Sequence, residues 1–113
     1  MAKLSISPEA QRDLLDIKKY ITTELDSPTA AVNTVSKITK SIRTLKTFPD
    51  RGAPLSLKVA VPNDYRILVC GKYLVFYRYE GGIATVARVI YGKRDYIAVL
   101  FGDMQADESE TSE

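Results

Sequence analysis

The first part of the chain carries apolar residues at helical spacing. Residues 2–6 alternate between apolar and polar and predict a short first strand. A helix start follows at Ser7 and Pro8, because serine caps free backbone N–H groups and proline fits the first helical turn. The predicted helix has one apolar stripe, formed by Ala10, Leu14, Ile17, Ile21 and Leu25. Asp13 and Asp16 fall largely off this stripe, so we expect both side chains to be solvated.

A second helix start follows at Ser27 and Pro28. Its apolar stripe consists of Ala31, Val35, Ile38, Ile42 and Leu45. The helix is expected to end before Pro49, because the residue preceding a proline avoids the helical conformation. The short link between the two helices predicts an antiparallel helical hairpin. Its C-terminal half is basic, and a solvated helix face is the simplest interpretation of Lys37, Lys40, Arg43 and Lys46.

From Tyr65 onward the period of the pattern changes to two, which is the spacing of β-strands. The predicted strands are 65–70, 73–79 and 83–91. Glycine-containing turns this short join only antiparallel strands, so the three form a meander. Residues 49–64 are expected to be mostly loop, with a short extended piece at 57–59. Residues 96–101 are apolar and fit either a final strand or a helical turn that packs on the core.

These elements predict an α+β fold, with an N-terminal strand and an antiparallel two-helix hairpin packed on a three- to four-stranded antiparallel sheet. The strands are apolar on both faces, with Tyr73, Val75, Tyr77 and Tyr79 on one and Leu74 and Phe76 on the other. The helices can cover only one face. Either a partner covers the second face, or residues 49–64 and the C-terminal segment do so.

The charge of the chain is unevenly distributed. Residues 1–102 hold 16 basic and 9 acidic side chains, whereas residues 103–113 hold five acidic side chains and no basic one. We therefore expect a single basic domain over residues 1–102 and an acidic, disordered tail over residues 103–113. A basic domain favours nucleic acid, the ribosome or an acidic protein as partner, and a soluble domain with a mildly basic surface is the simpler alternative.

The composition excludes several kinds of chemistry. The chain has no histidine, so histidine-based triads and metal sites of the His/Cys kind are absent. No phosphate-loop or dinucleotide fingerprint is present, and no cofactor or metal is expected. Cys70 is the single cysteine and fits a small core residue better than a nucleophile. The absence of a disulfide framework, of a signal peptide and of a membrane span predicts a cytoplasmic protein without a membrane partner.

The stretch after the last predicted strand is the candidate functional site. It places Tyr91, Lys93, Arg94 and Tyr96 around a glycine. Guanidinium and ammonium groups bind phosphate, and tyrosine rings stack on bases. The same groups could assist RNA cleavage, in which a guanidinium stabilises the charge on the phosphate, but a tyrosine base would need its pKa lowered from about 10. The alternative is that the tyrosines form the rim of the core and the cations are simply solvated.

Several motifs, taken in order, resemble the RelE/ParE superfamily of toxins from bacterial type II toxin–antitoxin systems. They are Ser7-Pro8-Glu9-Ala10 with Asp13-Leu14 and Ile17, then Leu45 and Phe48-Pro49 with Gly52, and finally Tyr73-Leu74-Val75-Phe76-Tyr77 and Arg88-Val89-Ile90-Tyr91-Gly92-Lys93-Arg94. The resemblance covers about residues 3–101. It implies a small toxin that inhibits growth or stabilises a plasmid, and that forms a hetero-oligomer with a cognate antitoxin, whose flexible segment wraps the sheet and the hairpin.

The superfamily contains two activities. RelE-like members cleave mRNA in the ribosome, and ParE-like members poison DNA gyrase. The long, capped helical hairpin looks ParE-like. If the protein were a RelE-like endoribonuclease, Arg94, Tyr91 and Lys93 would be its catalytic residues. The resemblance places a further catalytic arginine at Leu74, and this departure favours gyrase. The residues expected to bind target or phosphate are Arg66, Arg78, Arg88 and Tyr96.

Overall fold

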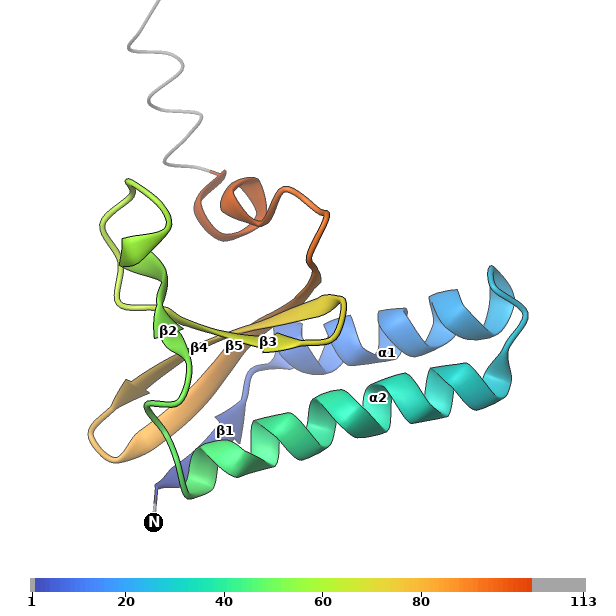
Figure 1. The fold of residues 1–113 in the computed structure, drawn as a ribbon, viewed down its shortest axis with the longest axis horizontal. Coiled ribbons are helices and arrows are strands. Elements are labelled where there is room, and N and C mark those ends of the chain that lie inside the picture. The colour runs from blue at the N-terminus through green and yellow to red at the C-terminus, as the bar shows by residue number, and fades with distance from the viewer. Residues whose placement is uncertain (1, 103–113) are drawn as a thin grey trace, which may run out of the picture.

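A computed structural model describes residues 2–102 of the chain, and the predicted acidic tail lies outside these residues. The fold is α+β: a helical hairpin packs on one face of a five-stranded sheet in the order β1-β5-β4-β3-β2 (Figure 1). The strands are β1 (Lys3–Ile6), β2 (Ala53–Pro54), β3 (Arg66–Cys70), β4 (Tyr73–Glu80) and β5 (Ile83–Tyr91).

The predicted meander and the predicted fold class are confirmed, because β3, β4 and β5 pair antiparallel in sequence order. The sheet as a whole is larger than predicted. The first strand joins it by pairing in parallel with β5, and the two-residue strand β2 adds to β3. The sheet is therefore mixed, with five strands. Alternation along a strand defines its two faces but does not specify its partner, so this pairing could not be derived from the pattern.

Both helices begin at the predicted caps. The Ser7 hydroxyl accepts the Ala10 N–H at 3.0 Å at the start of α1 (Pro8–Thr23), and the Ser27 hydroxyl accepts the Ala30 N–H at 3.3 Å at the start of α2 (Pro28–Arg43). The helix α1 ends two residues before the predicted Leu25. The link then passes through Asp26 with a φ of 50°, a left-handed conformation that aspartate tolerates better than most residues.

Three shorter segments are also helical. The helix α2 continues into a 3₁₀ turn at Thr44–Lys46, and a second 3₁₀ turn at Leu55–Leu57 replaces the extended piece expected at 57–59. Residues 96–102 form a helical segment, which was one of the two predicted alternatives. None of the helices within residues 2–102 is long and apolar enough to cross a membrane.

The sheet has a core on each face. The helix-facing core joins the apolar sides of α1 and α2 to Val75, Tyr77 and Val86. The opposite core contains Leu55, Ile67, Phe76, Ile90 and Phe101, with residues 96–100 packed against it. The second face of the sheet is therefore covered by the chain itself, as Figure 1 shows, and no partner is needed to bury it.

The loop that leads into β2 is held by a buried tyrosine. The Tyr77 hydroxyl accepts the Gly52 N–H at 2.9 Å, and the Tyr77 ring is fully buried. A Cβ atom at Gly52 would lie 2.7 Å from the Tyr77 ring and 2.9 Å from the Ile67 carbonyl oxygen. Glycine is therefore required here by the close approach of the loop to the sheet.

We predict that Tyr77→Phe lowers the free energy of unfolding by about 1–3 kcal/mol, because it leaves the buried Gly52 N–H without an acceptor. Urea unfolding at neutral pH measures this change. Tyr79→Phe is the matched control, since Tyr79 lies on the same strand but is 43% exposed, and its effect should stay within about 0.5 kcal/mol. Equal losses for the two variants would contradict the anchoring role of the Tyr77 hydroxyl.

Candidate functional site

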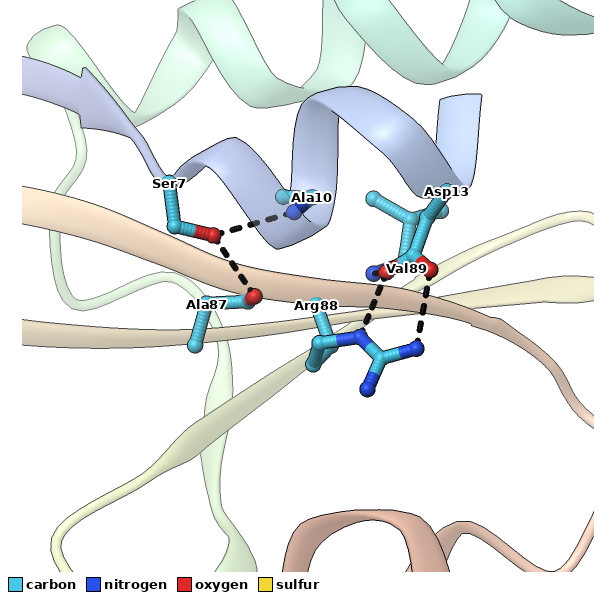
Figure 2. A network of polar contacts seen from close by, with 6 residues as sticks. All are labelled: Ser7, Ala10, Asp13, Ala87, Arg88 and Val89. Carbon is cyan, nitrogen blue, oxygen red and sulfur yellow. Dashed lines mark hydrogen bonds and ion pairs between the residues drawn. The ribbon is translucent and has the colours of Figure 1, made fainter. Parts of the chain in front are cut away.

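The side of the sheet next to α1 is organised by Asp13. Its Oδ2 atom accepts the Arg88 Nε–H at 2.7 Å and the Val89 backbone N–H at 2.9 Å, and its Oδ1 atom accepts the Arg88 Nη2–H at 2.9 Å (Figure 2). Asp13 is 8% exposed. The prediction that this side chain is solvated is therefore wrong: the tertiary fold brings a guanidinium to it, and a paired carboxylate can be buried.

The contacts of Asp13 follow from the course of β1. This strand covers β5 only as far as Val86, after which the register of β5 against β4 shifts. The backbone of β5 beyond this point would lack partners on the α1 side. The Ser7 hydroxyl donates to the Ala87 carbonyl oxygen at 2.8 Å, and the Asp13 carboxylate accepts the Val89 N–H (Figure 2). The Ser7 and Asp13 side chains thus pair with the backbone groups of β5 that β1 does not reach.

Three of the arginines expected to bind target or phosphate have partners inside the protein. The Asp13 hydrogen bonds raise the pKa of Arg88 and outweigh the effect of its burial. The Arg66 guanidinium donates to the carbonyl oxygens of Gly52 at 2.7 Å and Asp50 at 3.1 Å. Arg78 pairs with Asp64 at 2.7 Å, and its Cζ atom lies 4.1 Å from the centre of the Tyr65 ring.

We predict that Asp13→Asn lowers the free energy of unfolding by about 2–3 kcal/mol, because it leaves the Arg88 charge partly buried without a counter-charge. Denaturant unfolding measures the loss. Asp16→Asn, on the exposed side of the same helix, is the matched control and should change stability by less than about 0.5 kcal/mol. A loss no larger than that of the control would show that the ion pair contributes nothing net.

The predicted site stretch divides between the two faces of the sheet. Tyr91 and Arg94 line a hollow of about 500 Å³ between α1 and the ends of β4 and β5. Lys93 is exposed and does not line this hollow. Tyr96 packs on Phe76 in the opposite core, with ring centres 5.3 Å apart. The stretch therefore does not form one cluster, because the chain turns sharply after β5, where the Arg94 N–H donates to the Tyr91 carbonyl oxygen at 2.9 Å.

The hollow also contains residues that were not predicted as site residues. We call it the tyrosine groove, after the Tyr20, Tyr73 and Tyr91 side chains that line it together with Lys72 and Arg94. The rings of Tyr73 and Tyr91 lie 5.7 Å apart at 57°. Tyr20 comes from α1 and was not among the residues predicted for the site. The other two tyrosines meet because they are directly opposite in the β4–β5 register.

A second hollow of about 620 Å³ lies on the other side of the β3–β4 turn. We call it the basic hollow, because Lys37, Lys40 and Lys72 line it around an apolar floor that includes the buried Ile38. Cys70 also lines it and packs partly against the helix-facing core, in agreement with the prediction of a small core residue. Lys37 and Lys40 of α2 are exposed, as expected for a solvated helix face, and both line this hollow.

The Tyr73 phenol of the tyrosine groove is suited to donate a hydrogen bond. Burial raises the pKa of Tyr73, and the nearby hydroxyls of Tyr91 and Tyr20 raise it further. The Tyr73 phenol therefore keeps its proton at neutral pH. It can donate a hydrogen bond to an anion, but it is a poor general base.

The raised pKa of Tyr73 predicts a loss of stability in alkaline solution. In the unfolded chain this phenol ionises near its ordinary pKa of about 10, whereas in the folded protein it holds its proton to higher pH. The stability due to this difference is complete below pH 10 and is lost as the pH rises through the pKa of the folded protein. We expect Tyr73→Phe to flatten the decline in stability above pH 10, as measured by denaturant unfolding at several pH values. If stability declined above pH 10 as steeply in Tyr73→Phe as in the unsubstituted protein, the assignment of this decline to the Tyr73 phenol would be contradicted.

The described residues thus form a helical hairpin on one face of a mixed five-stranded sheet, with an aromatic and basic groove at the seam between them. The sequence model of the family described as the ParE toxin of type II toxin–antitoxin system, parDE, matches residues 4–96. The chain belongs to this family.

Two solved structures have the same fold. The first is a chain of the chromosomal ParDE toxin–antitoxin system from P. aeruginosa, which is 22% identical with a TM-score of 0.68. The second is a chain of the RelBE2 toxin–antitoxin complex from Mycobacterium tuberculosis, which is 16% identical with a TM-score of 0.55. Each similarity covers 80% of this chain and 96% of the other. A comparison with curated proteins found no match.

Proposed function

We propose that this protein is the toxin of a type II toxin–antitoxin module, that it inhibits growth in the cytoplasm by binding and poisoning DNA gyrase, and that a cognate antitoxin neutralises it. The family match supports the toxin class, since it extends over residues 4–96 and so over nearly all of the described fold. The choice between gyrase and mRNA as target depends on the side chains of the sheet.

The observation that carries this choice is the internal pairing of the arginines. Cleavage of RNA requires several cations around one phosphate, where negative charge develops. Arg66 and Arg88 direct their guanidinium groups at acceptors within the protein, and Leu74 occupies the position where the resemblance places another arginine. The Tyr73 phenol keeps its proton. This arrangement favours a toxin that acts through protein contacts.

The alternative is a ribosome-dependent mRNA endoribonuclease. In its favour, Tyr91 and Arg94 line the same groove as Lys72, so two cations and a phenol could meet one phosphate. Lys93 would add charge at the rim from its exposed position. Under this alternative Arg94 would stabilise the phosphate during cleavage, and Tyr91 and Lys93 would assist it.

The basic hollow supports an acidic protein as the neutralising partner. Its apolar floor and its three lysines match a segment that carries both apolar and acidic residues. The sheet face opposite the helices is already covered by the chain, so we place the main antitoxin contact at the seam between the hairpin and the sheet. The resulting complex is a toxin–antitoxin hetero-oligomer.

We predict that induced expression without the antitoxin arrests growth, with filamentous cells, a DNA-damage response and intact mRNA. Gyrase poisoning produces these effects because it blocks chromosome replication while leaving translation running at first. Microscopy, a damage-responsive reporter and primer extension on abundant transcripts measure them. Purified protein should also inhibit supercoiling by purified gyrase.

Lys58→Gln is a suitable control, since Lys58 is exposed, lies outside both hollows and should leave the arrest unchanged. Rapid mRNA cleavage with arrest of translation would replace the gyrase proposal with the endoribonuclease alternative. Harmless expression of a folded protein would contradict toxicity itself.

A further inference from the structure

Three tyrosine side chains from three different elements meet in the tyrosine groove. Tyr20 comes from α1, Tyr73 is the first residue of β4, and Tyr91 is the last residue of β5. Tyr20 is 55% exposed and Tyr91 is 40% exposed, so a ligand can reach their hydroxyls. Within residues 2–102 the hydroxyl of Tyr77 is the one tyrosine hydroxyl that bonds to the protein, so those of the groove are available for a ligand.

The charges of the groove favour an anion. Lys72 and Arg94 line it, and the ion pairs formed within residues 2–102 involve neither of them. Two carboxylates also line the groove. The charge of Asp13 is compensated by Arg88, which leaves Asp16 at the exposed side of the helix as the one carboxylate opposing the two cations. The lining therefore offers a net positive charge and phenolic donors.

The floor of the groove is apolar. Ile17 and Val89 line it below the charged rim, and the exposed side chain of Leu25 extends it at the end of the hairpin. A ligand that matches both parts has an anionic group for the rim and an aliphatic or aromatic group for the floor.

We propose that the tyrosine groove is a carboxylate-binding subsite, which takes an aspartate or glutamate side chain of a protein partner together with an apolar side chain of the same segment. Lys72 and Arg94 neutralise the carboxylate. The hydroxyls of Tyr20, Tyr73 and Tyr91 donate hydrogen bonds to its oxygens. The raised pKa of Tyr73 keeps its hydroxyl in the donating form.

An acidic peptide fits this groove better than a nucleic acid strand does. The rings of Tyr73 and Tyr91 are tilted at 57° against each other, so they do not form a slot between parallel faces in which a base could stack. Two cations are also few for a strand, whose binding depends on a positively charged groove that follows several phosphates. A single carboxylate needs no more than two cations and a few donors.

The subsite deepens the proposed function, because it defines the chemistry that a protein partner would present. Its test does not require gyrase or the antitoxin. The full chain is titrated with a blocked peptide in which leucine and glutamate alternate, and with a matched peptide that has glutamine in place of glutamate. Binding is followed by backbone amide chemical shifts and by tyrosine fluorescence, which is easily read because the chain has no tryptophan.

We expect the glutamate peptide to bind at least about tenfold more tightly than the glutamine peptide, with shifts concentrated at the tyrosine groove. The double variant Lys72→Gln, Arg94→Gln should remove most of this preference, and Tyr73→Phe should weaken binding about threefold to tenfold. Lys58→Gln should have no effect. Added salt should weaken binding of the glutamate peptide, because the attraction depends on exposed charges. Circular dichroism establishes that each variant is folded.

Lys72 and Tyr73 line both hollows, so the α2 residues distinguish the basic hollow. Equal affinity for the two peptides, or shifts confined to these α2 residues, would overturn the subsite. The subsite would also be overturned if the folded double variant Lys72→Gln, Arg94→Gln kept the full preference for the glutamate peptide over the glutamine peptide. Tighter binding of a single-stranded oligonucleotide than of the glutamate peptide would assign the groove to nucleic acid instead. If the glutamate peptide does not bind at the groove while the protein inhibits gyrase, the proposed function stands without the subsite. If the peptide binds while gyrase is unaffected, the subsite serves another partner.

Discussion

The carboxylate of Asp13 is the contact on which this side of the fold depends. It holds Arg88 and the Val89 N–H at the place where β1 has left β5 and the register of β5 shifts. A strand edge at such a shift exposes unpaired backbone groups to water and to other chains. Asp13 and the Ser7 hydroxyl pair with these groups from the helix, and this fastens α1 to the end of β5, next to the stretch predicted as the candidate site.

The same contact removes one cation, Arg88, from those available to a partner. A guanidinium that pairs with a buried carboxylate stabilises the fold and is lost to ligand binding. Arg88 is used in this way, whereas Arg66 donates to backbone carbonyl oxygens and Arg78 forms an exposed ion pair with Asp64. The cations that line the two hollows are lysines and Arg94. The surface next to the hairpin is thus basic and apolar at once, a combination suited to an acidic, amphipathic protein partner.

Much of the fold could be predicted from the sequence. The caps at Ser7 and Ser27, both helices, the meander from β3 to β5 and the two apolar faces of β4 follow the expected pattern. The candidate site was predicted only in part. Tyr91 and Arg94 share a groove, but Tyr96 belongs to the opposite core and Lys93 lies outside. Tyr20, Lys72 and Tyr73 were missing because they come from other elements.

One physical reason explains why most of the fold could be predicted but only part of the candidate site. Capping, periodicity and turn chemistry act between residues close in sequence, so the sequence by itself determined the helices, the hairpin turns and the sidedness of the strands. The parallel pairing of β1 with β5, the burial of Asp13 against Arg88 and the meeting of three tyrosines join distant segments; the first Asp13–Arg88 bond alone spans 75 positions. No local pattern encodes such contacts, because they depend on how the hairpin docks on the sheet, and only the tertiary structure decided them.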